Sequence, residues 1–518
     1  MERSFDEIKR DIRFRSSRIG HTRPASPKGP TGRMKVAEAE VRAFIVALKQ
    51  GNSCGAKGCR KIDSRKDRIL EDKSEQVSRK PKANVTKPTE DIRSRWEWTE
   101  PSVWTDPMLT TLEHNSVRGG RWHSLIDKVY NKENLLSAYR KVARNKGAAG
   151  VDHVTIEEFT ANLTKNISKL EDHLRKGTYQ VQGIRRVHIP KPGTHETRPL
   201  GIPTVRDRVV QAALRHVIEP ILERQFAEHS YGFRPNRGCK DALRRVDGLL
   251  KKGYRFTVDV DLKSYFDTIP HDRLMDELRK LISDNRVLGL VEKFLKAKIE
   301  DGLESWTPEN GAPQGAVLSP LLSNLYLNEL DHLMASAGYE MTRYADDLVI
   351  QCRTLEEAQA ALEKVREWVS KKGLTLHPTK TKIVDVDTDG FDFLGYRFIK
   401  HRRYPRRKSM KKFKDAIRFK TRRSNGHSLQ AIISDLNRTL RGWYEYFKHS
   451  WKSVFPEVDG YVRGRLRSIL RKRARRKGRG RGLDHHRYRN SFFAEQGLFS
   501  LETTYALNGQ PFERKPKA

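Results

Sequence analysis

The sequence predicts an α+β protein whose central feature is a split βαβ sheet. Residues 255–262 alternate strictly between apolar and polar, with Phe256, Val258 and Val260 on one face, which is the period of a strand. Residues 340–352 form two short β-favouring runs separated by small and acidic residues, the pattern of a hairpin. Helical segments separate and follow these elements, so we expect one sheet with helices on one face.

The first part of the chain reads as an extension rather than a domain. At 518 residues, the chain is long enough for about three or four domains. Residues 1–95 are rich in Lys, Arg, Ser, Gly and Pro, and only residues 41–48 are apolar enough for a short helix, so we expect a basic, flexible segment. Cys54 and Cys59 lie there, but no second Cys or His pair follows at zinc-ligand spacing, which favours free thiols.

Ordered structure is expected from Trp96 onward. Several tryptophans precede a helical pattern that begins at Leu125, and residues 155–158 form a capping box for a further helix. Residues 187–193 read as a strand that runs into a turn. Residues 206–226 then carry one apolar helical stripe.

The elements around the central sheet follow in order. After the first strand, residues 270–298 are helical, and residues 311–315 open a helix that runs to residue 330. After the hairpin, a cap at Thr354 begins a helix that ends at Gly373. Residues 374–386 and 391–398 are expected to be strands that close this part of the chain.

The hairpin turn carries the paired acids Asp346 and Asp347. Adjacent residues of a strand point to opposite faces, so only a turn lets both carboxylates approach one site. Two like charges between apolar strands are costly unless they bind a cation or a partner. Asp261 ends the alternating strand and could reach the same metal ions from a neighbouring strand. Asp259 shares the face of Asp261, so spacing does not choose between these two acids.

The composition is strongly basic, and the excess is concentrated near the C-terminus. The chain has 103 Lys and Arg against 65 Asp and Glu, a formal charge of +38, which points to nucleic acid as the partner. Residues 400–423 hold 13 basic residues and one acid, and residues 462–483 hold 11 and none. An amphipathic helix is expected between them, over residues 429–447. No apolar run reaches the ~20 residues of a membrane span, and the start has no signal core, so we expect an intracellular protein without membrane contact.

Five motifs stand out: Arg198-Pro-Leu-Gly-Ile-Pro-Thr-Val-Arg-Asp-Arg208, Tyr231-Gly-Phe-Arg-Pro235, Gly311-Ala-Pro-Gln-Gly-Ala-Val-Leu-Ser-Pro320, Tyr344-Ala-Asp-Asp347 and Phe393-Leu-Gly-Tyr396. Each is weak alone, but five in register are specific. Together they make the chain resemble a bacterial-type group II intron reverse transcriptase and maturase over about residues 104–490.

The resemblance implies a right-hand polymerase fold and a division of the chain. Residues 96–254 would form an N-terminal extension and the fingers, 255–400 the palm, 401–460 the thumb and maturase helices, and 461–518 a basic DNA-binding tail. It also implies an RNA-directed DNA polymerase that binds its intron RNA, assists splicing and makes cDNA by target-primed reverse transcription. The implied partners are intron RNA, a DNA target and primer, and deoxynucleoside triphosphates, in the cytoplasm and at the nucleoid when bound to DNA. The oligomeric state stays open.

The family's motifs assign roles to individual residues. Two Mg²⁺ ions would be held by Asp261, Asp346 and Asp347, with the Leu262 carbonyl as a further oxygen ligand; the family pattern favours Asp261 over Asp259. The nucleotide-binding residues would be Lys191, Arg198, Phe266, Gln314, Gly315 and Lys380, with Phe266 as the steric gate against ribose. The primer would contact Phe393, Leu394, Gly395 and Tyr396. RNA or DNA would contact Arg438, Arg441, Lys448, Arg471, Lys472, Arg473, Arg475 and Arg476.

Plainer readings of these residues remain open at this point. Phe266 also suits a core aromatic, Lys191 and Arg198 a solvated hairpin, Gln314 and Gly315 a helix cap, and Lys380 a surface lysine. A splicing factor with little polymerase activity, or a domesticated relative used in repair or defence, are the alternative functions. Only 28 residues follow Asn490 and none is cysteine, so we expect no His-Asn-His endonuclease and a primer from another source.

Overall fold

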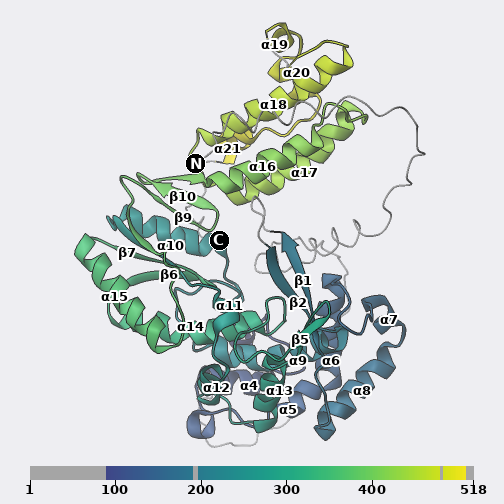
Figure 1. The fold of residues 1–518 in the computed structure, drawn as a ribbon, viewed down its shortest axis with the longest axis vertical. Coiled ribbons are helices and arrows are strands. Elements are labelled where there is room, and N and C mark those ends of the chain that lie inside the picture. Colours follow the sequence, from purple (N-terminus) through teal and green to yellow (C-terminus); the bar gives the residue numbers. More distant parts are fainter. Residues whose placement is uncertain (1–88, 191–196, 479–481, 509–518) are drawn as a thin grey trace, which may run out of the picture.

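The computed structural model describes residues 89–190, 197–478 and 482–508. Cys54, Cys59 and most of the expected N-terminal extension lie outside the described residues, as does Lys191. Figure 1 shows helices and a β-hairpin in the lower part, a sheet flanked by helices beside them, and a helical region above. None of the helices in the described part of the chain combines the length and apolar composition of a membrane span.

The N-terminal helices surround one long buried helix, α9. Thr204 caps α9 by accepting a hydrogen bond from the Asp207 backbone N–H (3.2 Å), and nearly every residue of α9 between 205 and 222 is buried. The Trp104 indole N–H donates to the His216 carbonyl of α9 (2.9 Å), which fixes the tryptophan-rich segment against it. The expected capping box at Thr155 and Glu158 is confirmed. The helices of this part are α3 (Thr89–Arg95), α4 (Asp106–Glu113), η1 (Arg118–Gly120), α5 (Ile126–Tyr130), α6 (Lys132–Asn145), α7 (Ile156–Ala161), α8 (Leu163–Lys176) and α9 (Val205–Glu223). The next helix, α10 (Cys239–Lys251), lies beside the central sheet instead (Figure 1).

A four-stranded sheet with the order β2-β1-β4-β5 lies beside these helices. Strand β1 pairs antiparallel with β2 and parallel with β4. The expected strand over residues 187–193 corresponds to β1, which begins earlier. The strands are β1 (Ile184–Pro190), β2 (Thr197–Ile202), β4 (Ile299–Asp301) and β5 (Glu304–Trp306).

The central sheet, called the carboxylate sheet below, has the strand order β6-β7-β3-β8, all antiparallel. The expected alternation of the first strand is confirmed, because Val258 and Val260 of β3 are buried on one face. Helices lie in the connections from β3 to β6 and from β7 to β8, as a split βαβ arrangement requires, and a tight turn joins β6 to β7. The elements are β3 (Phe256–Asp261), α11 (Tyr265–Thr268), α12 (His271–Arg279), α13 (Asn285–Leu295), α14 (Ser319–Ser336), β6 (Glu340–Tyr344), β7 (Asp347–Cys352), α15 (Leu355–Lys371) and β8 (Lys382–Asp385).

The two faces of the carboxylate sheet belong to different hydrophobic cores. Leu348 and Ile350 of β7 join the larger core, which continues through α14 and α15 to the N-terminal helices. Val349, between them, points to the other face and joins a second core with α10, Phe391 and the C-terminal helices. Helices therefore cover both faces: α14 and α15 lie on one, as expected, and the structure adds α10 on the other.

The C-terminal part begins with a small second sheet, β11-β10-β9, followed by helices. Sequence reasoning treated residues 391–398 as one strand, but Leu394 (φ 45°) and Gly395 (φ 83°) form a turn that divides it. Helix α18 runs through residue 460, so the expected boundary at that residue lies inside a helix. The elements are β9 (Phe391–Phe393), β10 (Tyr396–Ile399), β11 (Arg402–Pro405), α16 (Arg407–Lys420), α17 (Leu429–Phe447), α18 (Val454–Arg473), α19 (Leu483–Arg487), α20 (Asn490–Glu495) and α21 (Leu501–Asn508).

Candidate active site

The three predicted carboxylates meet at one end of the carboxylate sheet. Asp261, the last residue of β3, pairs directly with Asp347, the first residue of β7. Residues 344–347, called the carboxylate turn below, form a two-residue connection in which Tyr344 pairs with Asp347. Asp346 lies in that turn and is exposed. Pairing positions share a face, so Asp259 also lies on the side of Asp261 and Asp347.

Three residues from the segment before β8 contact Asp261. Lys380 Nζ lies 3.2 Å from Asp261 Oδ1, so the lysine expected at the nucleotide forms an ion pair with a carboxylate. The Asp261 backbone N–H donates to the Thr381 hydroxyl (3.3 Å), and the Asp261 carbonyl accepts from the His377 N–H (2.7 Å). Leu262, whose carbonyl was expected to bind metal, has a buried side chain and pairs with Leu376.

Crowding of the acids changes their proton affinities. Burial raises the pKa of Asp347 to about 7, and the negative charges of Asp259 and Asp346 add to the effect. Burial likewise raises the pKa of Asp259 to about 6. Loss of surrounding water also raises the pKa of Asp346, with a further contribution from Asp261, although its side chain remains accessible. A bound cation would relieve this repulsion.

The donor set suits a hard divalent cation, because Asp261, Asp346 and Asp347 offer only carboxylate oxygens. In the residues that the structure describes, no three His, Cys, Asp or Glu side chains are already gathered as a metal cage. One reason is visible at Asp261, whose carboxylate is turned to the Lys380 ammonium. The oxygen ligands and the strand register of Asp261, Asp346 and Asp347 therefore suit a divalent cation. Their side chains would have to rotate before all three could bind the same ion.

The predicted nucleotide-binding residues that the structure describes lie on four segments: β2, α11, the loop before α14 and the segment before β8. Arg198 of β2 is exposed, and its positive charge opposes the rise in the pKa of Asp346. Strand β2 therefore contributes a positive charge that acts on the carboxylate turn. Phe266 of α11 is half-buried, and its ring lies 5.5 Å from that of Tyr265. Its carbonyl accepts from the Ala312 N–H (2.7 Å), which joins α11 to the loop before α14.

Gln314 and Gly315 lie in that loop and do not open a helix as expected. Gly311 (φ 95°) and Gly315 (φ 112°) have left-handed backbone conformations, so the helix starts later, at Ser319. The Gln314 carbonyl accepts from the Gly201 N–H of β2 (2.6 Å). A Cβ on Gly315 would lie 2.4 Å from the Gly201 oxygen, so glycine is required for this close approach.

The Leu394–Gly395 turn approaches the carboxylates from the other side. A hydrogen bond from the Leu394 backbone lowers the pKa of Asp347, against the stronger effect of burial. The Tyr446 hydroxyl donates to the Leu394 carbonyl (2.6 Å). Phe393 and Tyr396, which were expected to touch the primer, are buried in the second core, so only the turn itself is accessible.

Comparison with known families supplies the decisive observation. A reverse transcriptase (RNA-dependent DNA polymerase) family model matches residues 189–398, and a model of the group II intron maturase-specific domain matches residues 410–488. The protein YkfC of Escherichia coli K12 is 38% identical over 324 residues, which cover 54% of this chain and 84% of YkfC. The chain belongs to the group II intron reverse transcriptase and maturase family.

Two further proteins are similar to part of this reverse transcriptase. The group II intron-encoded protein LtrA of Lactococcus lactis is 36% identical over 214 residues, 41% of this chain and 35% of LtrA, so the match spans about a third of that relative. A solved telomerase from Candida albicans, in complex with telomeric RNA, is 13% identical and covers 61% of this chain and 64% of its own, with a TM-score of 0.36. The reverse transcriptase family match confirms the predicted activity, and the sheets and helices described above confirm the predicted α+β class.

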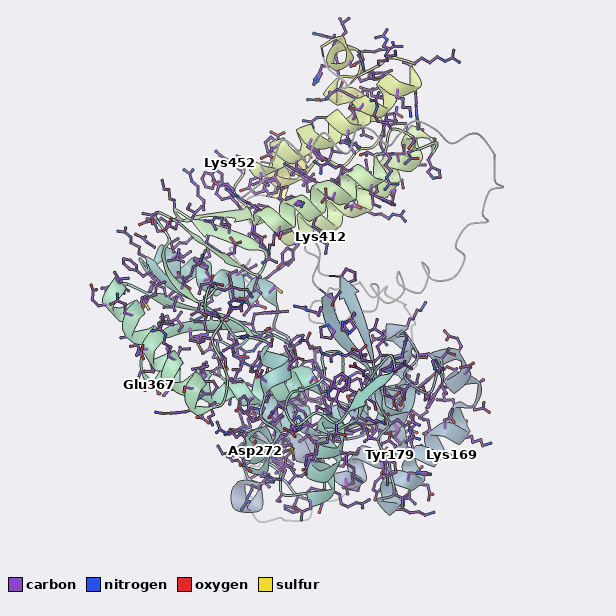
Figure 2. The ribbon with its side chains drawn as sticks, viewed as in Figure 1. Lys169, Tyr179, Asp272, Glu367, Lys412 and Lys452 are labelled. Atoms are coloured by element: carbon purple, nitrogen blue, oxygen red, sulfur yellow. The ribbon has the colours of Figure 1, made fainter. Side chains whose placement is uncertain are left out.

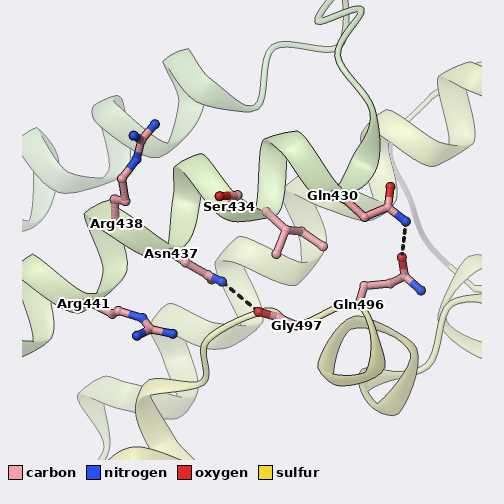
Figure 3. Close-up of a pocket in the computed structure, with 8 residues that line it drawn as sticks. Gln430, Ser434, Asn437, Arg438, Arg441, Gln496 and Gly497 are labelled. Atoms are coloured by element: carbon pink, nitrogen blue, oxygen red, sulfur yellow. Dashed lines mark hydrogen bonds between the residues drawn. The ribbon is translucent and has the colours of Figure 1, made fainter.

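The maturase domain carries part of the predicted RNA-binding surface on α17. Its apolar stripe is buried, and Arg438 and Arg441 lie on another side, where they line a surface pocket of about 400 Å³ (Figure 3). Gln430, Asn437 and Gln496 supply amides to the same pocket. Lys448 forms an ion pair with Glu445 (2.7 Å) and Arg438 one with Asp435 (2.9 Å), so both charges are partly offset.

The basic residues at the end of α18 divide into two groups. Arg471 pairs with the buried Asp484 (2.6 Å), and Arg473 donates to the His427 carbonyl, so these two serve the fold. The others face a surface pocket of about 390 Å³, lined by Arg423, Lys472, Arg475, Arg476, Lys477 and Gly478. Five positive charges around one hollow suit the phosphates of a nucleic acid. Sequence reasoning could not separate the groups, because Asp484 lies outside the basic run.

Proposed function

We propose that this reverse transcriptase copies its group II intron RNA into DNA, assists the splicing of that RNA, and starts cDNA synthesis from a primer in the DNA target. The observation that carries the proposal is the register of Asp261 opposite Asp347, with Asp346 in the adjoining turn. A module that only binds RNA gains nothing from crowding these acids, because their repulsion costs stability unless a cation is bound.

The proposed cofactors are two Mg²⁺ ions held by Asp261, Asp346 and Asp347. When bound, such ions lower the pKa of the primer 3′-hydroxyl and offset charge on the leaving pyrophosphate. Arg198 would attract the triphosphate of a deoxynucleotide to the carboxylate turn. Lys380 would leave its ion pair with Asp261 and bind the same triphosphate. Phe266 would exclude a ribose 2′-hydroxyl by its bulk.

The proposed nucleic-acid partners are the intron RNA, the DNA target and its primer. Support comes from the charge of +38 and from the five basic side chains around the pocket at the end of α18. Other basic side chains, such as that of Lys412 on α16, project from the surface of the helical region (Figure 2). We place this activity in the cytoplasm, and at the nucleoid while the DNA target is bound, because these partners occur there.

Primer extension on an RNA template tests the proposal. Asp346→Ala should abolish Mg²⁺-dependent cDNA synthesis and leave RNA affinity within about twofold, because the carboxylate turn and the basic surfaces are separate. Asp272→Ala, which removes an exposed acid of α12 (Figure 2), should leave synthesis unchanged. If well-folded wild-type protein binds intron RNA but makes no cDNA, a splicing factor without polymerase activity is the better description.

A further inference from the structure

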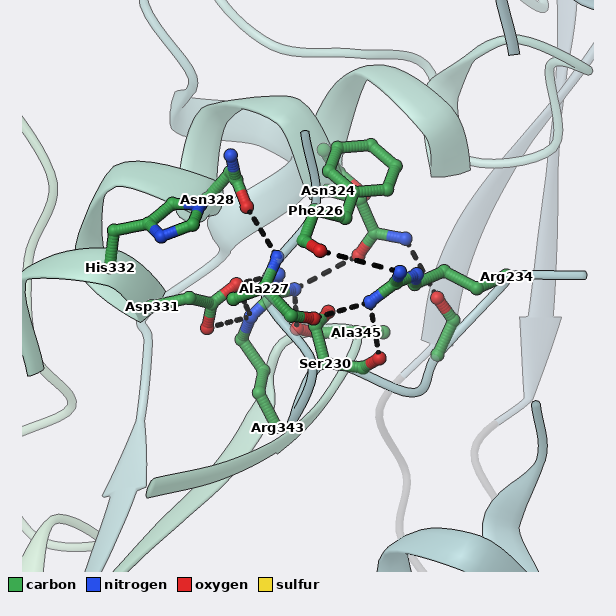
Figure 4. A network of polar contacts seen from close by, with 12 residues as sticks. Phe226, Ala227, Ser230, Arg234, Asn324, Asn328, Asp331, His332, Arg343 and Ala345 are labelled. Atoms are coloured by element: carbon green, nitrogen blue, oxygen red, sulfur yellow. Dashed lines mark hydrogen bonds and ion pairs between the residues drawn. The ribbon is translucent and has the colours of Figure 1, made fainter. Parts of the chain in front are cut away.

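Arg343 is a charged residue buried completely beneath the carboxylate turn. It lies in β6, two residues before Ala345, and its side chain is 0% exposed. Burying a guanidinium away from water costs free energy unless its N–H groups form hydrogen bonds. The partners of Arg343 therefore indicate which parts of the structure it holds in place. Figure 4 shows the side chain between α14 and the turn.

The contacts of Arg343 reach both α14 and the carboxylate turn. Its Nε donates to the Asp331 carboxylate (2.8 and 3.0 Å), and Nη2 donates to the same group. Its Nη1 donates to Asn324 Oδ1 (2.9 Å) and to the Ala345 carbonyl (2.9 Å). Asp331 and Asn324 are seven residues apart on α14, which is two helical turns, so both lie on one face of the helix.

The turn is also held from a second direction. Asn324 Nδ2 donates to the Gly232 carbonyl (2.7 Å), and a Cβ on Gly232 would lie 2.2 Å from the Ala345 nitrogen. Ala345 has φ 58°, a left-handed conformation that a residue with a side chain keeps only when its surroundings impose it. Arg343 and Gly232 supply those surroundings.

The same helix supports the loop expected under the nucleotide. Ser319, the first residue of α14, donates from its hydroxyl to the Pro313 carbonyl (2.8 Å), one residue before Gln314. One rigid element thus has the nucleotide loop at its start and the partners of Arg343 further along. Its attachment to the carboxylate turn sets the distance between the two.

We propose that Arg343 is a positioning residue for polymerisation: through the Ala345 carbonyl and Asn324, it fixes the turn that carries Asp346 and Asp347 relative to the loop that carries Gln314. This inference rests on the proposed function of the carboxylates. Because its side chain is completely buried, Arg343 acts through the backbone of the turn and not by direct contact with a substrate.

The variant that tests the inference is Arg343→Lys. A lysine keeps the charge beside Asp331, but one ammonium cannot reproduce the planar fork that also reaches Asn324 and Ala345. The matched control is Arg467→Lys. Arg467 of α18 is also buried, and its guanidinium donates to the Tyr488 carbonyl (2.9 Å) and to Asn490 Oδ1 (2.9 Å), neither of which belongs to the carboxylate turn or to the segment beside it.

Three measurements separate positioning from plain stabilisation. Both variants should lower the thermal midpoint. Only Arg343→Lys should reduce kcat, by about 10- to 100-fold with a nearly constant KM for the deoxynucleotide, because the turn is displaced while the nucleotide contacts stay. Only Arg343→Lys should also weaken Mn²⁺ binding in an electron paramagnetic resonance titration, with Asp346→Ala marking the site.

The outcomes are distinct. Equal kcat and Mn²⁺ affinity in the two variants at similar thermal midpoints would overturn the inference and leave Arg343 a structural residue. If Arg343→Lys does not fold, Asn324→Ala removes the bridge to Gly232 while Asp331 keeps its partner, and it should change kcat and Mn²⁺ affinity in the same direction. A wild type that binds Mn²⁺ at Asp346 but makes no cDNA would reject the polymerase proposal alone, since the Mn²⁺ comparison still decides the role of Arg343.

Discussion

Each acid of the carboxylate turn is destabilising on its own. Asp347 is the clearest case, because burial and two neighbouring negative charges raise its pKa to about 7. At neutral pH, ionisation of Asp347 therefore lowers the stability of the folded protein, and a bound metal cation would offset this loss. Function and stability are opposed at this residue, as is common in active sites.

Asp347→Asn should therefore stabilise the protein in EDTA while it abolishes cDNA synthesis. Between about pH 4 and 7 the folded state holds a proton on Asp347 that the unfolded state has lost, so wild-type stability falls as pH rises, by up to ~1.4 kcal/mol per pH unit. Asparagine does not titrate, so its advantage should grow over this window and level off above it. Thermal midpoints from pH 4 to 8 measure this, with Asp272→Asn as the exposed control; a constant difference would contradict it.

The sequence predicted the acids at this scale but not the residues that hold them. Asp346 and Asp347 follow from turn chemistry, which is local, whereas strand period allows Asp259 as well as Asp261 and only the family resemblance favours Asp261. The pairing of Arg343 with Asp331 depends on how β6 packs on α14, which local patterns do not encode. A signal was present, since Arg343 is a lone charge between residues that suit a buried strand, and buried charges need a partner.

At the scale of elements, the carboxylate turn depends on a neighbouring segment with no secondary structure of its own. Residues 229–231 pair with Arg343 of β6 through backbone hydrogen bonds of 2.9 and 3.0 Å. They bring Gly232 against the turn, where only a residue without a Cβ fits. The motif at residues 231–235 therefore contributes a backbone surface as well as side chains.

Gly232→Ala should disturb the turn without changing any charged group. The added Cβ would lie 2.2 Å from the Ala345 nitrogen, so backbone must shift, which we expect to cost about 1–3 kcal/mol and most of the cDNA synthesis. Gly248→Ala in α10, where a Cβ meets open space, should instead stabilise the helix by about 0.5–1 kcal/mol. Thermal midpoints and primer extension on both variants test this, and equal behaviour of the two would contradict it.

Elements with strong end signals were predicted well, and those divided by unusual backbone were not. The capping box at Thr155 and the N-cap at Thr354 identify where α7 and α15 begin. In contrast, residues 391–398 have a strand composition apart from Gly395, so only the family resemblance indicated the turn that the left-handed pair at Leu394 and Gly395 forms. Positive φ at a leucine is rare enough that composition gives no warning of it.

At the scale of the whole molecule, fewer basic side chains are available to bind a nucleic acid than the net charge suggests. Sequence reasoning grouped Arg471 and Arg473 with Arg475 and Arg476. The first two are engaged with Asp484 and the His427 carbonyl, whereas the last two line the basic pocket. Net charge predicts a polyanionic partner, but tertiary contacts decide which cations are available to it.

Replacing Arg475 and Arg476 with Gln should therefore change the salt dependence of binding. Loss of two phosphate contacts on duplex DNA would reduce the slope of log K against log salt by up to about 1.8. Lys165 and Lys169, exposed on α8, supply the control pair, and their change to Gln should leave the slope unaltered. Binding titrations from low to moderate salt measure both, and an unchanged slope for the arginine pair would remove this pocket from the interface.

Strand β7 has a consequence for how such proteins can be recombined. Leu348 and Ile350 belong to the larger core, and Val349 between them belongs to the core shared with the maturase helices. The polymerase and maturase portions are therefore not interchangeable cassettes. A chimaera that received a foreign maturase region would have to match it to the core that Val349 and α10 share with the maturase helices. A polymerase portion expressed alone would expose to water the apolar side chains of that core that the maturase helices cover.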